Sequence, residues 1–498
     1  MTHAKAGVRV RRQRQALPAG RWCSLLFCVL LPPAAGFATQ ASLALQKAAA
    51  LVQEGRLQEA DEQARLALAD PVARAAACSV LGAIRLQQDR LAEGAELLQE
   101  AVRLEPHLLG AQLNLAQVYT LQGRRELAVP VFRRVLELDR GNAVARMALA
   151  SSEAEKGKYQ ESLELARPAL SHLADVPAAW TVGLAELLVK GGRVDDGLSV
   201  LEQAGKADPS SYELAFALGG AYLVKGEPGR ALEAYDRALA VKPVALAALR
   251  QAAAVAERQG ELERSLSCWM RARRVAPEDP QVLLGFGRVC LKMDLLDDAE
   301  PALTEAARLR PGEPAYQYTL AVAKVGKRQY EAAQGLLEPL VEKRPDDAQL
   351  QYALGSVLYM QGLLAEAATR LQASLRLDAD QMASPYYLAL VARDEGHAAE
   401  AIERLEGLLR RYPDHAASCE ALGGLYLNNQ RYPEAERYLR RALQLNPKSS
   451  KASYQLGLLL ARTGRQQEAT RQLELAKSLR KEDEASSRLQ LRLLDPDS

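Results

Sequence analysis

Similar residues recur every 34 positions through most of this 498-residue chain, and this periodicity limits what the chain can fold into. With the register started at Ala41, the period fits thirteen consecutive units, and only the fourth carries an extra residue, near Pro177. The predicted units begin near residues 41, 75, 109, 143, 178, 212, 246, 280, 314, 348, 382, 416 and 450. Because so short a unit cannot bury an apolar face alone, neighbouring units must stack into one continuous core, which is a solenoid.

Two columns of small side chains recur in every unit. The eighth position is always Gly or Ala, and the twentieth is always Ala, Gly or Ser. Two helices can cross closely only where neither carries a bulky side chain, so each unit is expected to be a helical hairpin whose helices touch at these positions. Nine units carry a glycine near position fifteen, where a left-handed residue ends a helix. Eight units end in a proline that closes the second helix.

One unit carries the full set of marker residues: Leu218-Gly219, Tyr222, Gly226, Ala231, Tyr235, Ala238 and Pro243. With these markers the chain resembles the tetratricopeptide repeat family, over residues 41–483. The resemblance implies an all-α fold, a right-handed superhelical solenoid of antiparallel helix pairs, with the first helix of each pair lining a concave groove. It also implies that peptides or other proteins bind in that groove, usually without catalysis.

The two ends of the chain differ from the repeats. Residues 1–38 contain six basic residues and no acid, followed by the apolar run Trp22–Leu31 and then small residues. That order is typical of a secretory signal peptide cut before Thr39, and the apolar run is shorter than the roughly 20 residues that span a bilayer. Its removal would change the formal net charge from +2 to −4 and leave the repeat array 39–483. Residues 484–498 are predicted to form a tail or a short capping helix.

The signal pattern predicts a secreted or periplasmic protein, with no stable membrane span once the signal is removed. The Ala- and Arg-rich composition indicates a bacterial source. Two alternatives stay open, namely a protein anchored to the membrane by an uncleaved signal and a cytoplasmic protein that keeps residues 1–38. The intact mass of the native protein distinguishes the full chain from residues 39–498.

The sequence predicts no catalytic residues, no metal ligands and no cofactor. The repeats leave no room for a separate catalytic domain, no phosphate-binding loop or His-Glu-x-x-His pair occurs, and the five histidines lack metal-ligand spacing. The cysteines beyond the signal are Cys78, Cys268, Cys290 and Cys419, and they form no Cys-x-x-Cys pair. We expect buried thiols, although Cys268 and Cys290 lie in adjacent units and leave a disulfide open.

Candidate binding residues come from the first helix of each unit, whose positions two, five, nine, twelve and thirteen should face the groove. The fifth position is aromatic in five units: Phe216, Tyr318, Tyr352, Tyr386 and Tyr454. Tyrosine provides contact area and a hydroxyl, and it is enriched at binding surfaces. Tyrosine is also a common packing residue of the family at this position, so a structural role is the alternative.

A second candidate is a group of basic residues predicted on the same face in units seven and eight: Arg250, Arg258, Arg288 and Lys292. Because arginine binds carboxylates through two parallel hydrogen bonds, this group could hold an acidic peptide. Glu257 partly offsets its charge, and a merely solvated face is the alternative.

These features together predict a non-catalytic scaffold for protein partners, in envelope assembly, secretion or polysaccharide export. A cytosolic adaptor is the first alternative. An RNA-binding helical repeat is disfavoured by the strict 34-residue period and the net charge of −4, and no acid–base cluster supports an enzyme site in the groove. The expected partner is a protein or peptide of unknown identity, not nucleic acid.

Overall fold

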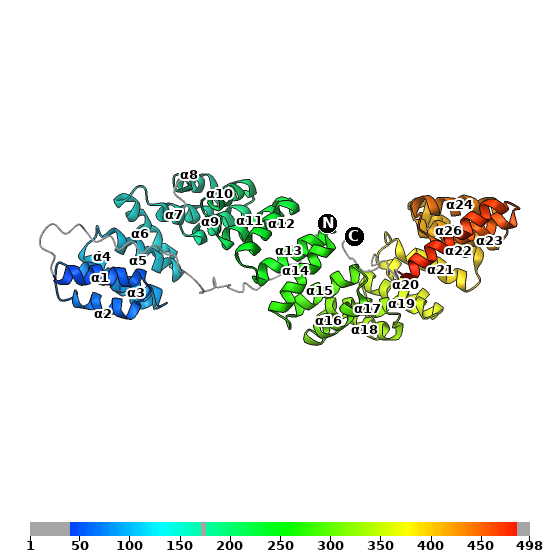
Figure 1. Ribbon diagram of the computed structural model, residues 1–498, viewed down its shortest axis with the longest axis horizontal. Helices are drawn as coiled ribbons and strands as arrows, with labels where there is room; N and C mark the ends of the chain where they lie inside the picture. The colour runs from blue at the N-terminus through cyan, green and yellow to red at the C-terminus, as the bar shows by residue number, and fades with distance from the viewer. Residues whose placement is uncertain (1–39, 171–175, 486–498) are drawn as a thin grey trace, which may run out of the picture. The chain divides into compact units, whose positions relative to one another are not determined.

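The computed structural model describes residues 40–170 and 176–485, and the regular secondary structure of these residues is helical. Its 26 helices form successive antiparallel pairs (Figure 1). The expected all-α solenoid of helix pairs is therefore confirmed, and 26 helices are consistent with about thirteen repeats. The predicted signal peptide and all but the first two residues of the predicted tail lie outside the described residues.

The chain divides into two compact units, residues 1–243 and residues 244–498. The N-terminal unit contains helices α1 (Gln40–Gln53), α2 (Leu57–Leu66), α3 (Arg74–Gln87), α4 (Leu91–Leu104), α5 (Leu109–Leu121), α6 (Arg125–Leu138), α7 (Ala143–Glu155), α8 (Tyr159–Ala166), α9 (Ala178–Lys190), α10 (Val194–Ala207), α11 (Tyr212–Lys225) and α12 (Pro228–Val241). Odd-numbered helices are the first members of their pairs.

The C-terminal unit contains helices α13 (Leu246–Arg258), α14 (Leu262–Val275), α15 (Pro280–Lys292), α16 (Leu296–Leu309), α17 (Pro314–Gly326), α18 (Tyr330–Lys343), α19 (Ala348–Met360), α20 (Leu364–Leu377), α21 (Ala383–Asp394), α22 (Ala398–Arg411), α23 (Ala416–Asn428), α24 (Tyr432–Leu445), α25 (Ser450–Arg462) and α26 (Gln466–Ala485). In both units, each first helix begins at the start of a predicted repeat or one residue from it.

The two columns of small residues meet inside each helix pair. Ser265, at position twenty, donates its hydroxyl to the carbonyl of Ala253, at position eight, over 2.8 Å. A Cβ added to Gly94 would lie 3.3 Å from the carbonyl oxygen of Gly82. The small residues therefore let the two backbones of a pair approach each other, as the sequence predicts.

A residue in the left-handed conformation follows the first helix of all thirteen repeats. Nine of these residues are the predicted glycines, with φ between 71° and 88°. At the same position the other four repeats hold Asp89, Asp294, Arg328 and Gln430, with φ between 57° and 60°. An L-residue in this conformation costs about 1–2 kcal/mol, so the fold imposes the turn even where glycine is missing.

Side-chain links join successive repeats at position eleven of the first helix. The Tyr222 hydroxyl donates to Glu202 Oε1 over 2.5 Å, and the Arg230 guanidinium lies over the Tyr222 ring, 4.3 Å from its centroid. The same twenty-residue separation recurs in the pairs Tyr426–Glu406 and Tyr119–Gln99. Burial and then Glu202 raise the pKa of Tyr222 to about 12, which keeps the phenol neutral and able to donate.

The first helices line the inner side of the stack within each unit. Successive first helices pack on each other, for example α3 on α5 and α23 on α25. Comparable contact between successive second helices is not found among the described residues. A stack whose first helices are closer together than its second helices must curve around the first helices, so a partner that enters the concave side meets these helices.

Candidate binding surface

The tyrosines predicted to form one row are not equivalent in the structure. Tyr318 on α17 and Tyr386 on α21 are half-buried, whereas Tyr454 on α25 is 52% exposed. Tyr352 on α19 is only 3% exposed and packs in the core of its unit. The prediction that Tyr352 offers contact area in a groove is therefore wrong, because the next repeat covers its ring.

A cluster of rings spans the repeats that contain α19 and α21. The Tyr387 ring contacts Tyr352, Tyr359 and Tyr386 edge-on, with centroid separations of 5.9, 5.4 and 5.6 Å. We call Tyr318, Tyr352, Tyr359, Tyr386 and Tyr387 the tyrosine cluster, since Tyr318 and Tyr386 also lie close enough to Tyr352 to influence its ionisation. His415 extends the cluster by packing edge-on against Tyr386 at 5.3 Å.

Two members of the cluster were not singled out from the sequence. Tyr359 lies at position twelve of its repeat, which the register predicts to face the groove, so its position was the signal that could have identified it. Tyr387 lies next to Tyr386, at a position that the register does not assign to the groove. Its role follows only from the ring contacts.

The hydroxyls of the cluster differ in their partners. Tyr318 accepts a hydrogen bond from Gln349 Nε2 at 3.3 Å, and Tyr359 donates to Asp394 Oδ2 at 2.7 Å. Within the described residues, Tyr386 and Tyr387 have no hydrogen-bond partner, and the buried hydroxyl of Tyr352 has none either. Burial raises the pKa of Tyr318 to about 12 and also raises the pKa of Tyr386, so these phenols remain donors at neutral pH.

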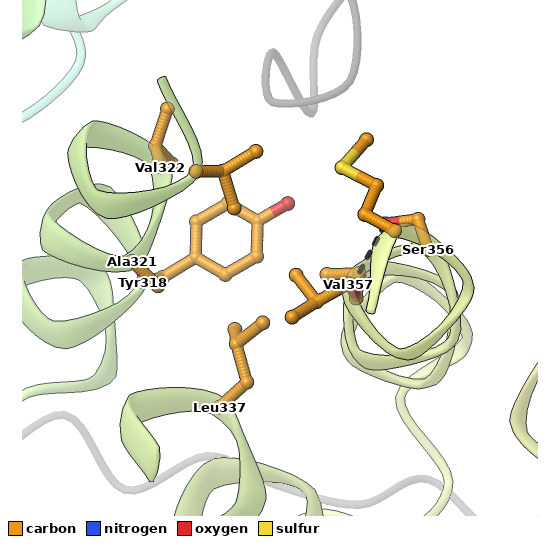
Figure 2. A pocket seen from close by; sticks show the side chains of 9 residues that line it. Tyr318, Ala321, Val322, Leu337, Ser356 and Val357 are labelled. Carbon is orange, nitrogen blue, oxygen red and sulfur yellow. Dashed lines mark hydrogen bonds between the residues drawn. The ribbon is translucent and has the colours of Figure 1, made fainter. Parts of the chain in front are cut away.

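A small apolar cavity lies beside Tyr318, between α17 and α19. Figure 2 shows the Tyr318 ring extending from α17 toward Ser356 and Val357 of α19, with Leu337 of α18 nearby. The cavity measures about 20 Å³, enough for about one water molecule. Ligand pockets for small molecules measure about 300–1,000 Å³, so this part of the molecule offers a partner a surface rather than an enclosed pocket.

Two carboxylates pair with three of the four predicted basic residues. Glu257, whose side chain is 4% exposed, lies 2.7 Å from Arg288 Nη2 and 3.2 Å from Lys292 Nζ. Arg250 lies 3.8 Å from Asp279, which caps the N-terminus of α15. Only Arg258, which is exposed, stays outside these pairs. The two carboxylates offset two of the four positive charges, and the capture of an acidic peptide by this group stays a prediction.

Phe216 belongs to the N-terminal unit, whereas the tyrosine cluster belongs to the C-terminal unit. Its ring stacks on Tyr212 at 5.7 Å and contacts Tyr235 at 5.6 Å. The ammonium of Lys242 lies over the Tyr212 ring, 4.3 Å from its centroid. These contacts indicate a local aromatic packing role for Phe216.

The described cysteines are buried. No disulfide joins any two of Cys78, Cys268, Cys290 and Cys419, and their burial is as expected for small apolar core residues. Burial raises the pKa of Cys290 to about 12. Within residues 40–170 and 176–485, His, Cys, Asp and Glu side chains form no group that could hold a metal ion. No helix of these residues is both long and apolar enough to cross a membrane.

Comparison with known families agrees with the helical hairpins, the small-residue columns and the turns. Models of the Tetratricopeptide repeat match residues 85–152, 182–245, 250–314, 318–381, 386–448 and 420–477. These matches cover more than half of the chain. The chain belongs to the tetratricopeptide repeat family. Proteins of this fold are generally non-catalytic scaffolds that bind proteins or peptides, so a role in protein–protein interaction follows from the family.

Individual relatives share only part of their length with the chain. The Protein CTR9 homolog of Arabidopsis thaliana is 26% identical over 135 residues, which are 27% of the chain and 12% of that protein. The Cellulose synthase operon protein C of Pseudomonas fluorescens is 23% identical over 300 residues, 58% of the chain and 21% of that protein. The chain thus spans about an eighth to a fifth of the length of these relatives.

Among solved structures, the chain in the crystal structure of the APC/C hetero-tetramer Cut9-Hcn1 is similar to this protein. It is 16% identical, with a TM-score of 0.43 over 85% of the present chain and 96% of the other. Yeast Tom70 is 15% identical, with a TM-score of 0.36 over 89% of the present chain and 96% of its own. Both are similar in fold alone.

Proposed function

We propose that this protein is a non-catalytic scaffold that binds segments of partner proteins on the concave, first-helix face of its C-terminal unit. The observation that carries the proposal is the tyrosine cluster, in which half-buried rings present hydroxyls that lack partners among the described residues. Tyrosine is enriched at protein interfaces because its ring and hydroxyl contribute at low conformational cost.

We further propose that the scaffold works outside the cytoplasm. The basic, apolar and small-residue segments of residues 1–38 support export. The name of the Pseudomonas relative, Cellulose synthase operon protein C, favours an accessory role in polysaccharide export over the other envelope roles. The second candidate, a cytosolic adaptor with an uncleaved N-terminus, has the same binding surface and differs only in location.

The intact mass of the native protein tests the location. A C-terminally tagged chain is purified from periplasmic, membrane and cytoplasmic fractions, and each form is weighed by mass spectrometry. Export predicts a periplasmic form of residues 39–498. A cytoplasmic form with residues 1–38 retained would leave the cytosolic adaptor as the function.

Site-specific crosslinking tests the binding surface. A photo-reactive amino acid replaces Tyr386, on the first-helix face, or Arg376, an exposed residue of the second helix α20. We expect a defined partner protein to be crosslinked in cells from position 386 and not from position 376. Equal capture from both positions, or from neither, would contradict the proposal. The buried Tyr352 is unsuitable for this experiment, because its replacement would disturb the core.

A further inference from the structure

A pocket in the C-terminal unit lies between α22 and α24, the second helices of two successive repeats (Figure 1). It measures about 430 Å³, and sites for small molecules measure about 300–1,000 Å³. Its apolar part consists of Leu409, Pro413, Cys419 and Tyr438, and three of these residues belong to one hydrophobic cluster. An apolar wall with a few charged groups beside it is typical of a ligand site. The pocket is distinct from the first-helix face and goes beyond the proposed function.

The pocket exists because position four of this repeat carries a short side chain. In another repeat that position is Gln351, whose Nε2 donates to the carbonyl of Pro345, the last proline of the preceding repeat, at 2.9 Å. Gln112 makes the equivalent bond at 3.1 Å. Cys419 and Pro413 hold the two corresponding positions here, and both line the pocket. Because cysteine is too short to fill the space that glutamine occupies, this junction between repeats keeps a cavity.

One guanidinium at the pocket has no carboxylate. Arg410 lines the pocket, is exposed, and forms no ion pair within the described residues. The other two charged lining residues already have partners: Arg441 pairs with Asp414, and Glu406 accepts a hydrogen bond from the Tyr426 hydroxyl at 2.5 Å. A guanidinium binds a carboxylate through two parallel hydrogen bonds, so Arg410 is available to a carboxylate ligand.

The charges around the pocket also favour an anion. Arg437 lies over the ring of Tyr438, 4.6 Å from its centroid, and no ion pair of Arg437 occurs in the described part of the chain. The neighbourhood therefore holds three arginines and two carboxylates: Arg410, Arg437, Arg441, Glu406 and Asp414. One positive charge is in excess, which complements a ligand with a single negative charge.

From the size, the apolar wall and the excess charge, we propose that this pocket binds a small monocarboxylate with an apolar body, about the size of a phenyl ring on a short chain. The body packs against Leu409 and Tyr438 beside Cys419, and the carboxylate binds the guanidinium of Arg410. Such a ligand contacts α22 and α24 at once, so its binding stabilises the junction between these two repeats.

Ligand-detected NMR with the purified full chain tests this proposal. The probe is hydrocinnamate, a phenyl ring on a propionate. Hydrocinnamide has the same body without the charge, and acetate has the charge without the body. We expect the probe to bind with a dissociation constant of about 1 mM, because so small a ligand gains little from one pocket, and each control to bind at least about fivefold more weakly. Equal binding of either control, or no binding of the probe at about 20 mM, would overturn the proposal.

Variants assign the binding to the pocket. Cys419→Gln introduces the side chain that Gln351 carries at the same position, so it should abolish binding in a chain that circular dichroism shows to be folded. Cys78→Gln makes the same change at position four of another repeat and should leave the affinity within about twofold. Arg410→Gln should weaken binding about fivefold. Its matched control is Arg376→Gln, since Arg376 is exposed at the same position of the preceding repeat. Unchanged affinity in Cys419→Gln and Arg410→Gln would refute the site.

Hydrogen exchange of the native chain gives a readout that needs no variant. At ten times the dissociation constant, hydrocinnamate should slow exchange in α22 and α24 by up to about tenfold and leave α3 and α4 unchanged. Equal effects on both helix pairs would contradict binding at the pocket. If a peptide that ends in phenylalanine with a free carboxylate binds more than about tenfold more tightly than hydrocinnamate, the assignment to a small molecule is wrong. These outcomes leave the scaffold function to its own test, crosslinking from position 386.

Discussion

Two neighbouring glycines of α11 allow the close packing of a helix pair to be measured directly. A Cβ added to Gly219 would lie 2.5 Å from the ring of Tyr235, which is 2% exposed. A Cβ added to Gly220 would meet no heavy atom within 4 Å. Both residues lie inside the same helix, so Gly219→Ala and Gly220→Ala gain the same helix propensity and differ in packing alone.

The expected magnitudes follow from these distances. Replacing a helical glycine by alanine stabilises by about 1 kcal/mol, and Gly220→Ala should show this gain. In Gly219→Ala the ring of Tyr235 or the backbone must shift, and overpacking a dense core costs about 1–3 kcal/mol. The two variants should therefore differ in unfolding free energy by about 1–3 kcal/mol.

Hydrogen exchange of the α11 and α12 amides, followed by mass spectrometry on the full chain, measures this difference locally. Since about 1.4 kcal/mol corresponds to tenfold in protection, exchange should be about 5- to 140-fold faster in Gly219→Ala than in Gly220→Ala. Adding Tyr235→Leu should restore much of the loss, because Leu337 holds the same position opposite Ala321 in another repeat. Protection of Gly219→Ala equal to or above that of Gly220→Ala would refute the close-packing argument.

Three further predictions concern the turns, the links between repeats and the thiols. Arg328→Gly should stabilise the protein by about 1 kcal/mol, because the exposed Arg328 has φ 57° and glycine adopts this left-handed conformation without strain. Urea unfolding measures the change, and an unchanged or lower urea midpoint would contradict the prediction. The folded-state pKa of Tyr222, about 12, exceeds the ordinary value of 10.0, so its contribution to stability is complete below pH 10 and is lost as pH rises from 10 to 12. In Tyr222→Phe, the free energy of unfolding should fall less between pH 10 and pH 12 than in the native chain. An equally steep fall in the variant would show that Tyr222 does not cause it. Iodoacetamide should label Cys268 and Cys290 only after denaturation, and peptide mapping without reduction should find no Cys268–Cys290 disulfide.

The period and its two small-residue columns made the fold predictable from the sequence. Small residues at positions eight and twenty are required because the backbones of the two helices lie close together there. This requirement is local to one helix pair and recurs in each repeat, so it appears in the sequence as a regular pattern. The turns were predicted only in part. Asp294 and Arg328 adopt the left-handed conformation although the sequence carries no glycine there, because the helix pair on either side fixes the turn.

Interactions between side chains of neighbouring repeats were harder to predict. The sequence places Arg288, Lys292 and Glu257 on one face, but only the structure brings the buried Glu257 carboxylate within 2.7 Å of Arg288 and 3.2 Å of Lys292. Net charge over a face says nothing about which charges meet. For the same reason the sequence did not predict the ring contacts of Tyr387, which depend on the rotamers of three other tyrosines.

The burial of the tyrosines at position five shows where a repeat register stops being informative. Tyr352 and Tyr454 hold equivalent positions, yet their exposed fractions are 3% and 52%. Tyr352 is covered by Tyr387 of the following repeat, whereas Tyr454 lies in the last repeat that the structure describes. Exposure on the concave face is therefore set by the bulk that the next repeat supplies at position six. The binding surface of such an array therefore depends on each pair of neighbouring repeats and not on one repeat alone. In the tyrosine cluster, Tyr387 covers the ring of Tyr352, and the adjacent Tyr386 places an accessible hydroxyl beside it.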